Sequence, residues 1–169
     1  MQDKSMIEKE FNRAYFQYIS SIYRFFYLKS DSQEIAEDLT NETFLRLWKT
    51  LNSGQNINNT RAFLYKIARN LLTDFYRKKA QKTEISLESA PEIIDSNDFQ
   101  QRIINNSEIE RIKKALQGLK EEYQLVIIWH YLEDIPIREI AEIMEKTEEN
   151  TRVLLHRALQ SLREKISNF

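Results

Sequence analysis

Five polar side chains on one face of a predicted helix have the chemistry of a nucleic-acid surface. At about 100° per residue, one side of the segment 61–79 carries Lys66, Arg69, Asn70, Thr73 and Arg77. Cationic side chains neutralise phosphates, and amides or hydroxyls can hydrogen-bond base edges. The segment holds six basic residues and one acidic residue, whereas solvated helix faces usually mix both signs. We interpret this face as a nucleic-acid surface, although it could equally meet an acidic protein partner.

The segment 135–163 has the pattern of a helix-turn-helix. A helix is predicted over about 136–145 with Pro136 in its first turn, then a polar turn over 145–148, then a second helix over about 148–166. The N-terminal part of such a second helix enters the major groove of DNA. Any tight helical pair can produce the same pattern, and the outward valine suits either a dimer contact or a thymine methyl. The residues expected to face DNA are Asn150, Arg152, Val153, His156 and Arg157.

Helical periodicity also predicts the elements that position these residues. Further helices are expected over about 7–28, 33–51, 61–79, 107–117 and 121–131, with a polar loop over 52–59. Candidate N-caps are Ser30, Asp31 and Ser32 for the second helix and Thr60 for the third, and Gly118 is a candidate C′ glycine. The predicted fold is all-α. It has a helical bundle over 1–79, a flexible acidic linker over 80–106 and a four-helix helix-turn-helix domain over 107–169.

The net charge of −1 hides a segregation along the chain. Residues 1–79 contain thirteen basic and nine acidic residues, whereas residues 107–169 contain ten basic and twelve acidic residues. The average charge therefore argues neither for nor against nucleic acid, and the distribution carries the information.

Composition narrows the class of protein. The chain has no cysteine and only two histidines, so disulfides and a metal site are not expected. We find no glycine-rich phosphate loop and no nucleophile–histidine pairing, so no enzyme activity, cofactor or small-molecule substrate is expected. No apolar run approaches a signal peptide or a membrane span, which predicts a cytoplasmic protein without membrane insertion.

Four motifs resemble those of the extracytoplasmic-function sigma factors of bacterial RNA polymerase. Residues 36–48 (AEDLTNETFLRLW) and 62–77 (AFLYKIARNLLTDFYR) are similar to the second and third conserved helices of that family. Residues 139–142 (EIAE) and 155–158 (LHRA) are similar to its helix-turn-helix. The resemblance covers about residues 7–79 and 107–167.

The resemblance implies roles for individual residues. The 36–48 helix would bind a coiled coil of the polymerase's largest subunit through Asp38, Asn41, Glu42 and Phe44. The 62–77 helix would bind the minus-ten promoter element with the basic face identified above, and the 52–59 loop would take an unstacked base. The final helix would read the minus-thirty-five element. Core RNA polymerase and promoter DNA are thus the implied partners, and an anti-sigma protein is a further one.

The chain departs from the family pattern in the helix-turn-helix. It has Pro136 where the family often has serine, Glu145 where it often has glycine, and Val153 and Leu154 where it tends to have serine and an arginine. A degenerate member that binds polymerase without reading a promoter is therefore an alternative. Another is a helix-turn-helix regulator that acts without polymerase, which predicts a dimer and palindromic sites.

Overall fold

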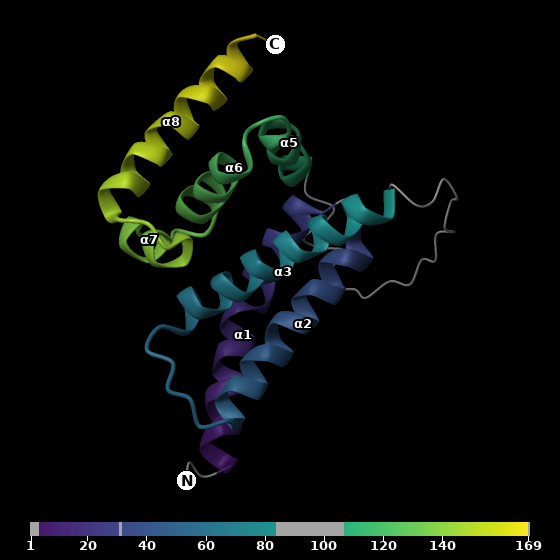
Figure 1. Cartoon of the computed structure of the whole chain (residues 1–169), viewed down its shortest axis with the longest axis vertical. Helices are drawn as coiled ribbons and strands as arrows, with labels where there is room; N and C mark the ends of the chain where they lie inside the picture. Colours follow the sequence, from purple (N-terminus) through teal and green to yellow (C-terminus); the bar gives the residue numbers. More distant parts are fainter. Residues whose placement is uncertain (1–3, 31, 84–106, 169) are drawn as a thin grey trace.

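The computed structural model describes residues 4–30, 32–83 and 107–168, which form seven α-helices and one π-helical turn (Figure 1). The described residues contain no strand, and the all-α prediction is confirmed. An N-terminal block contains α1 (Lys4–Lys29), α2 (Gln33–Asn52) and α3 (Thr60–Thr83). A C-terminal block contains α5 (Ser107–Leu116), α6 (Glu121–Ile127), the π-turn η1 (Ile128–Leu132), α7 (Ile137–Met144) and α8 (Glu148–Ser167). Helix α3 continues past residue 79, and the rest of the predicted linker, 84–106, lies outside the described residues.

The N-terminal block is held together by an apolar face on each of its three helices. Helix α1 packs against α2 and α3, and α2 against α3. Ile22, Phe25, Phe26, Leu47 and Leu64 are fully buried between them. Each helix is amphipathic, so burying these stripes against one another stabilises helices whose sequences alone would be marginal.

Most predicted helix ends are found, with two corrections. The Ser32 hydroxyl accepts a hydrogen bond from the Ile35 amide at 3.1 Å, as a capping serine should. At α3 the cap is Asn59 instead of Thr60, because the Asn59 carboxamide oxygen accepts from the Ala62 amide at 3.0 Å. Gly118 follows α5 with φ of +84°, which confirms the C′ glycine. Pro136 lies at the N-cap of α7, one residue before its first turn.

A π-turn interrupts the helix that was predicted over 121–131. The Glu133 amide donates to the carbonyl of Ile128, five residues earlier, at 3.1 Å. The wider turn rotates the following side chains relative to α-helical spacing. Trp129 is fully buried, whereas Tyr131, two residues later, is 52 % exposed.

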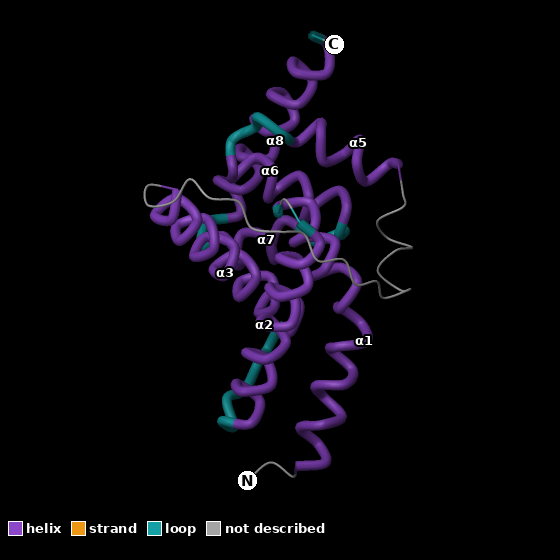
Figure 2. The backbone as a smooth tube through the Cα atoms, turned by 90° about the vertical axis from the view of Figure 1, so that its right-hand side faces the viewer, coloured by secondary structure: helices purple, strands orange, loops and turns teal. Residues whose placement is uncertain are grey.

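The two blocks lie against each other and share one hydrophobic cluster (Figure 2). Helix α7 packs on α3, and α5 contacts α1. Trp129 of the C-terminal block stacks on Phe25 at a ring-centroid distance of 5.9 Å and meets Tyr65 edge-on at 6.1 Å. None of the helices in the described ranges has an apolar stretch long enough to cross a bilayer.

Candidate nucleic-acid interface

Helix α3 buries one side and presents the predicted polar face on the other. Leu64, Ala68 and Leu72 are at most 1 % exposed. Asn70, Thr73 and Arg77 are exposed, and Lys66 and Arg69 are half-buried. The structure therefore brings the five predicted side chains to one face of one helix. Their contacts with nucleic acid stay a prediction.

Two side chains of this face, those of Thr73 and Arg77, make local contacts along α3. The Thr73 hydroxyl donates to the carbonyl of Arg69 at 3.0 Å. Arg77 lies 3.7 Å from Asp74, and both side chains are more than half exposed. An exposed ion pair of this kind contributes little to stability and is readily exchanged for another anion. The side-chain amide of Asn70 has no hydrogen-bond partner among the described residues. It is therefore available for the predicted contact with a base edge.

Two of the five predicted residues contact the C-terminal block. Lys66 Nζ lies 3.2 Å from Glu145 Oε1, and the Arg69 guanidinium donates to the carbonyl of Ile143 at 3.3 Å. At the start of the same helix, Arg61 forms two hydrogen bonds with Glu139, at 2.7 and 2.8 Å. The sequence analysis did not predict the contact between Arg61 and Glu139. The opposite charge excess of the two halves was the one sequence feature that indicated an attraction between them.

The ion pair between Arg61 and Glu139 is the best formed of these contacts. Two parallel N–H···O bonds match the guanidinium fork to the carboxylate. Hydrogen bonding to Arg61, supported by the positive charge and by Asn59, holds the pKa of Glu139 below its ordinary value despite partial burial. The carboxylate is therefore charged at neutral pH, which suits electrostatic attraction across the interface.

The loop over 52–59 connects α2 to α3 and keeps several amide side chains in solvent. Gln55, Asn56 and Asn58 are exposed, whereas Ile57 is half-buried against the core and fixes the loop to the bundle. Gly54 has φ of +78°, a conformation that other residues adopt only with strain. The exposed amides have the donors and acceptors needed to bind an unpaired base.

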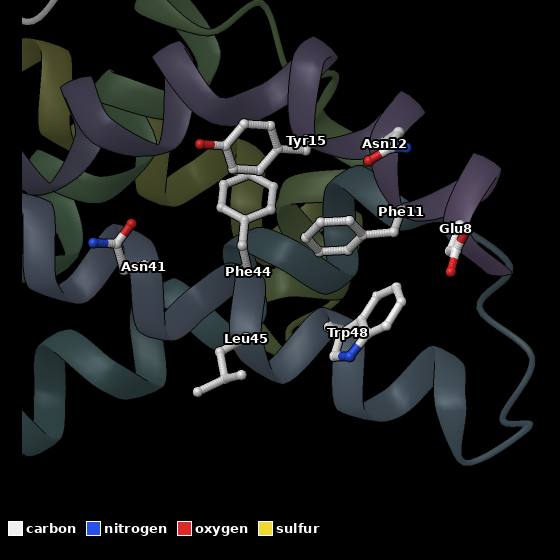
Figure 3. Close-up of a pocket in the computed structure, with 8 residues that line it drawn as sticks. All are labelled: Glu8, Phe11, Asn12, Tyr15, Asn41, Phe44, Leu45 and Trp48. Carbon is white, nitrogen blue, oxygen red and sulfur yellow. The ribbon is translucent and has the colours of Figure 1, made fainter.

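Helix α2 carries the residues predicted to bind polymerase. Asp38 and Asn41 are exposed, and Glu42 pairs with Arg46 at 2.9 Å along the helix. Phe44 is only 3 % exposed and meets Tyr15 edge-to-face at 5.0 Å. Figure 3 shows Phe44 among the rings of Tyr15 and Phe11 in a groove between α1 and α2, which Asn41 also lines. Phe44 thus supports this surface from beneath.

The helix-turn-helix of α7 and α8 leaves its predicted DNA face open. Thr147 caps α8 by accepting the Asn150 amide at 3.1 Å. Glu145 ends α7 with φ of +56°, in the left-handed region where the resembling family often has glycine. The five predicted residues are all exposed on α8: Asn150, Arg152, Val153, His156 and Arg157. Only Arg152 among them has a described side-chain ion pair, with Glu148 at 3.2 Å.

Comparison with known proteins matches both blocks separately. The family model "Sigma-70 region 2" matches residues 14–82, and "Sigma-70, region 4" matches residues 109–162. The ECF RNA polymerase sigma factor SigM of Bacillus subtilis is 29% identical over 156 residues, covering 90% of this chain and 92% of SigM. The ECF RNA polymerase sigma factor BldN of Streptomyces coelicolor is also 29% identical, covering 90% of this chain, which spans only 58% of BldN.

Solved structures show the same fold. CnrH, in complex with the cytosolic domain of CnrY, superposes with a TM-score of 0.71 at 16% identity, covering 95% of this chain and 90% of CnrH. The sigma factor RpoE of Bartonella quintana, in complex with the anti-sigma factor NepR, superposes with a TM-score of 0.70 at 23% identity, covering 94% of this chain and 98% of RpoE.

Proposed function

Because the chain belongs to the sigma-70 family, as an RNA polymerase sigma factor of the extracytoplasmic-function type, we propose how its two blocks share the work of promoter recognition. The N-terminal block binds core RNA polymerase and the minus-ten element, and the C-terminal block binds the minus-thirty-five element. The observation that carries this proposal is the polar face of α3, which lies within the region 2 match and is the one predicted from residue pattern alone.

Helix α3 acts on the minus-ten element through two kinds of contact. Lys66, Arg69 and Arg77 neutralise phosphates and so position the strand, whereas Asn70 and Thr73 contact bases. The exposed amides of the 52–59 loop hold an unstacked base next to them. Stacking and hydrogen bonding to unpaired bases offset the few kcal/mol that unstacking costs. Promoter opening is thus driven by binding energy, and the chain acts without catalytic activity of its own.

The outer face of α2 over residues 38–42 binds the polymerase. Asp38, Asn41 and Glu42 supply polar contacts, and buried Phe44 holds α2 at a fixed distance from α1. In the C-terminal block, the exposed face of α8 enters the major groove, where Val153 contacts a thymine methyl and Arg152 a phosphate. Such a protein works where core polymerase is, in the cytoplasm.

We also propose an anti-sigma protein as a partner of this chain. The fold supports this proposal, because CnrH and RpoE share it and their structures are complexes with CnrY and NepR. The aromatic groove between α1 and α2 is a suitable surface, because it combines apolar rings with the polar rim of Glu8 and Asn12.

Run-off transcription tests the proposal directly. Purified core polymerase is assayed with and without the chain on pooled genomic template from the source organism. New discrete start sites that depend on the chain are expected, and they should disappear with a double variant, R69A and N70A. The matched control is R163A, an exposed arginine near the end of α8. Polymerase binding without new transcripts would favour a degenerate member of the family. If the chain neither binds polymerase nor yields new transcripts, the remaining account is a regulator that acts without polymerase.

A further inference from the structure

Helix α8 begins with two acidic side chains that have different surroundings. Glu148 pairs with Arg152 at 3.2 Å along the helix. Glu149 is exposed, and its carboxylate has no hydrogen-bond or ion-pair partner among the described residues. Both carboxylates are favourable next to the positive end of the helix dipole. The dipole does not explain why an unpaired carboxylate lies on the part of α8 that is proposed to enter the major groove.

The buried side of α8 fixes the direction in which Glu149 points. Thr151 and Ala158 are fully buried, and Leu155 is 9 % exposed. The Thr151 hydroxyl also donates to the carbonyl of Thr147 at 2.8 Å, at the start of the helix. At about 100° per residue, Glu149 and Val153 lie within roughly 30° of the direction opposite this buried side. These two residues therefore form the centre of the outward face in the N-terminal half of α8.

A carboxylate at the centre of a DNA-binding face is repelled by phosphates, so a favourable contact needs a hydrogen-bond donor. In the major groove only the amino groups of cytosine and adenine donate. Adenine presents its N7 acceptor beside the amino group, which disfavours a group that can only accept, whereas cytosine presents the N4 amino group alone. We infer that Glu149 is a specificity-determining residue that reads a cytosine of the minus-thirty-five element, an inference that rests on the proposed function.

Val153 restricts the base pair next to that cytosine. Its side chain is 44 % exposed and is assigned to a thymine methyl group. Glu149 and Val153 are four residues apart, which is about 6 Å along a helix that rises about 1.5 Å per residue. Successive base pairs are about 3.4 Å apart. The two side chains therefore reach base pairs no more than about two steps apart, and the predicted element contains a cytosine and a thymine within that distance.

Glu148 is a matched control that the chain itself provides. It carries the same charge as Glu149 and lies in the same helical turn. On the helical wheel, Glu148 and Arg152 point roughly 90–130° away from the centre of the outward face. Their ion pair thus lies at the side of α8, where Arg152 is assigned to a phosphate. Removing the Glu148 charge should affect all DNA sequences alike, whereas changing Glu149 should affect one base pair.

Selection from randomised duplex DNA tests the inference with the full chain and without polymerase. Duplexes with a short randomised block are incubated with the immobilised chain at low salt, where phosphate contacts are strongest, and the bound duplexes are sequenced. The native chain should enrich a cytosine within two base pairs of an enriched thymine. E149Q should change the cytosine to adenine, because glutamine pairs with both N6 and N7 of adenine. The enriched thymine should stay.

Anisotropy with two duplexes that differ only at this base pair measures the size of the effect. The native chain should bind the cytosine duplex about 5- to 150-fold more tightly than the adenine duplex. E149Q should reverse the order, and E149A should bind the two about equally. E148Q should bind both more tightly by the same factor and keep the native preference. Helix content by circular dichroism should be unchanged in all three variants.

Two results would overturn the inference. One is a native chain that enriches no cytosine near the thymine. The other is that E149Q and E149A behave as E148Q does, with tighter binding to both duplexes and the native preference kept, because Glu149 would then only repel phosphates. Run-off transcription decides the proposed function separately. A chain that initiates transcription but shows no change of preference in E149Q keeps its function and loses this residue assignment, whereas a change of preference without transcripts does the reverse.

Discussion

Arg69 and Asn70 are adjacent on α3, and the proposed function gives them different partners. Arg69 is a half-buried cation assigned to a phosphate, and Asn70 is an exposed amide assigned to a base edge. Substituting each by alanine should therefore weaken promoter binding in two distinguishable ways. The Arg69 variant loses an electrostatic contact that does not depend on base sequence, and the Asn70 variant loses a contact that does.

The expected magnitudes follow from these assignments. Each phosphate contact contributes a slope of about 0.7 for single strands to about 0.9 for duplex in log affinity against log salt. Between two salt concentrations that differ fourfold, R69A should therefore lose about 2.6- to 3.5-fold less affinity than the native chain. N70A should keep the native salt slope and lose about 1–3 kcal/mol, with relaxed preference for the base it contacts.

The assay is anisotropy of a labelled, forked promoter fragment bound by the reconstituted holoenzyme at several salt concentrations. R163A serves as the control, because it removes the same charge from an exposed position outside the proposed interfaces. Equal salt slopes for R69A and N70A, or a slope change in R163A as large as that in R69A, would refute the division of α3 into phosphate and base contacts.

Three further predictions concern stability. F44A should lower the free energy of unfolding, measured by urea unfolding, by about 3–5 kcal/mol. The control F16A, at a side chain 79 % exposed, should stay within about 0.5 kcal/mol of the native chain. Similar losses in the two variants would contradict the burial argument. Glu145 has φ of +56°. The E145G variant should be more stable than the E145A variant by about 1 kcal/mol in thermal unfolding, because only glycine adopts this conformation without strain. Burial and the Glu110 hydrogen bond raise the pKa of Tyr27 to about 12 from 10.0. The contribution of this contact to stability is therefore complete below pH 10 and is lost as pH rises toward 12. Tyrosinate absorbance that rises with an ordinary pKa would show that the contact between α1 and α5 is absent.

The helices and the polar face of α3 could be predicted because both depend on local pattern. Apolar spacing fixes which side of α3 is buried, and the opposite side then carries the cations whatever lies beyond it. Side-chain capping at Ser32 was equally local. The capping prediction at Thr60 was wrong because the adjacent Asn59 carboxamide accepts the Ala62 amide instead. Domain boundaries and individual site residues stay predictions.

The π-turn and the packing of the two blocks could not be predicted from local pattern. The extra residue in the turn has no signature in the spacing of residues 121–131. Within the turn Trp129 is fully buried and Tyr131 is exposed. Arg24 and Glu133 are 109 positions apart, and Arg61 and Glu139 are 78 apart. No periodicity links residues at such separations, and only the opposite charge excess of the two halves indicated an attraction.

The two interpretations of the basic face, nucleic acid or an acidic protein surface, need not exclude each other. An extended cationic face attracts any array of negative charges, and the identity of the bound array depends on local concentration as much as on fit. Glu139 and Glu145 belong to the same chain and so are present at a high effective concentration near α3, while free DNA is dilute.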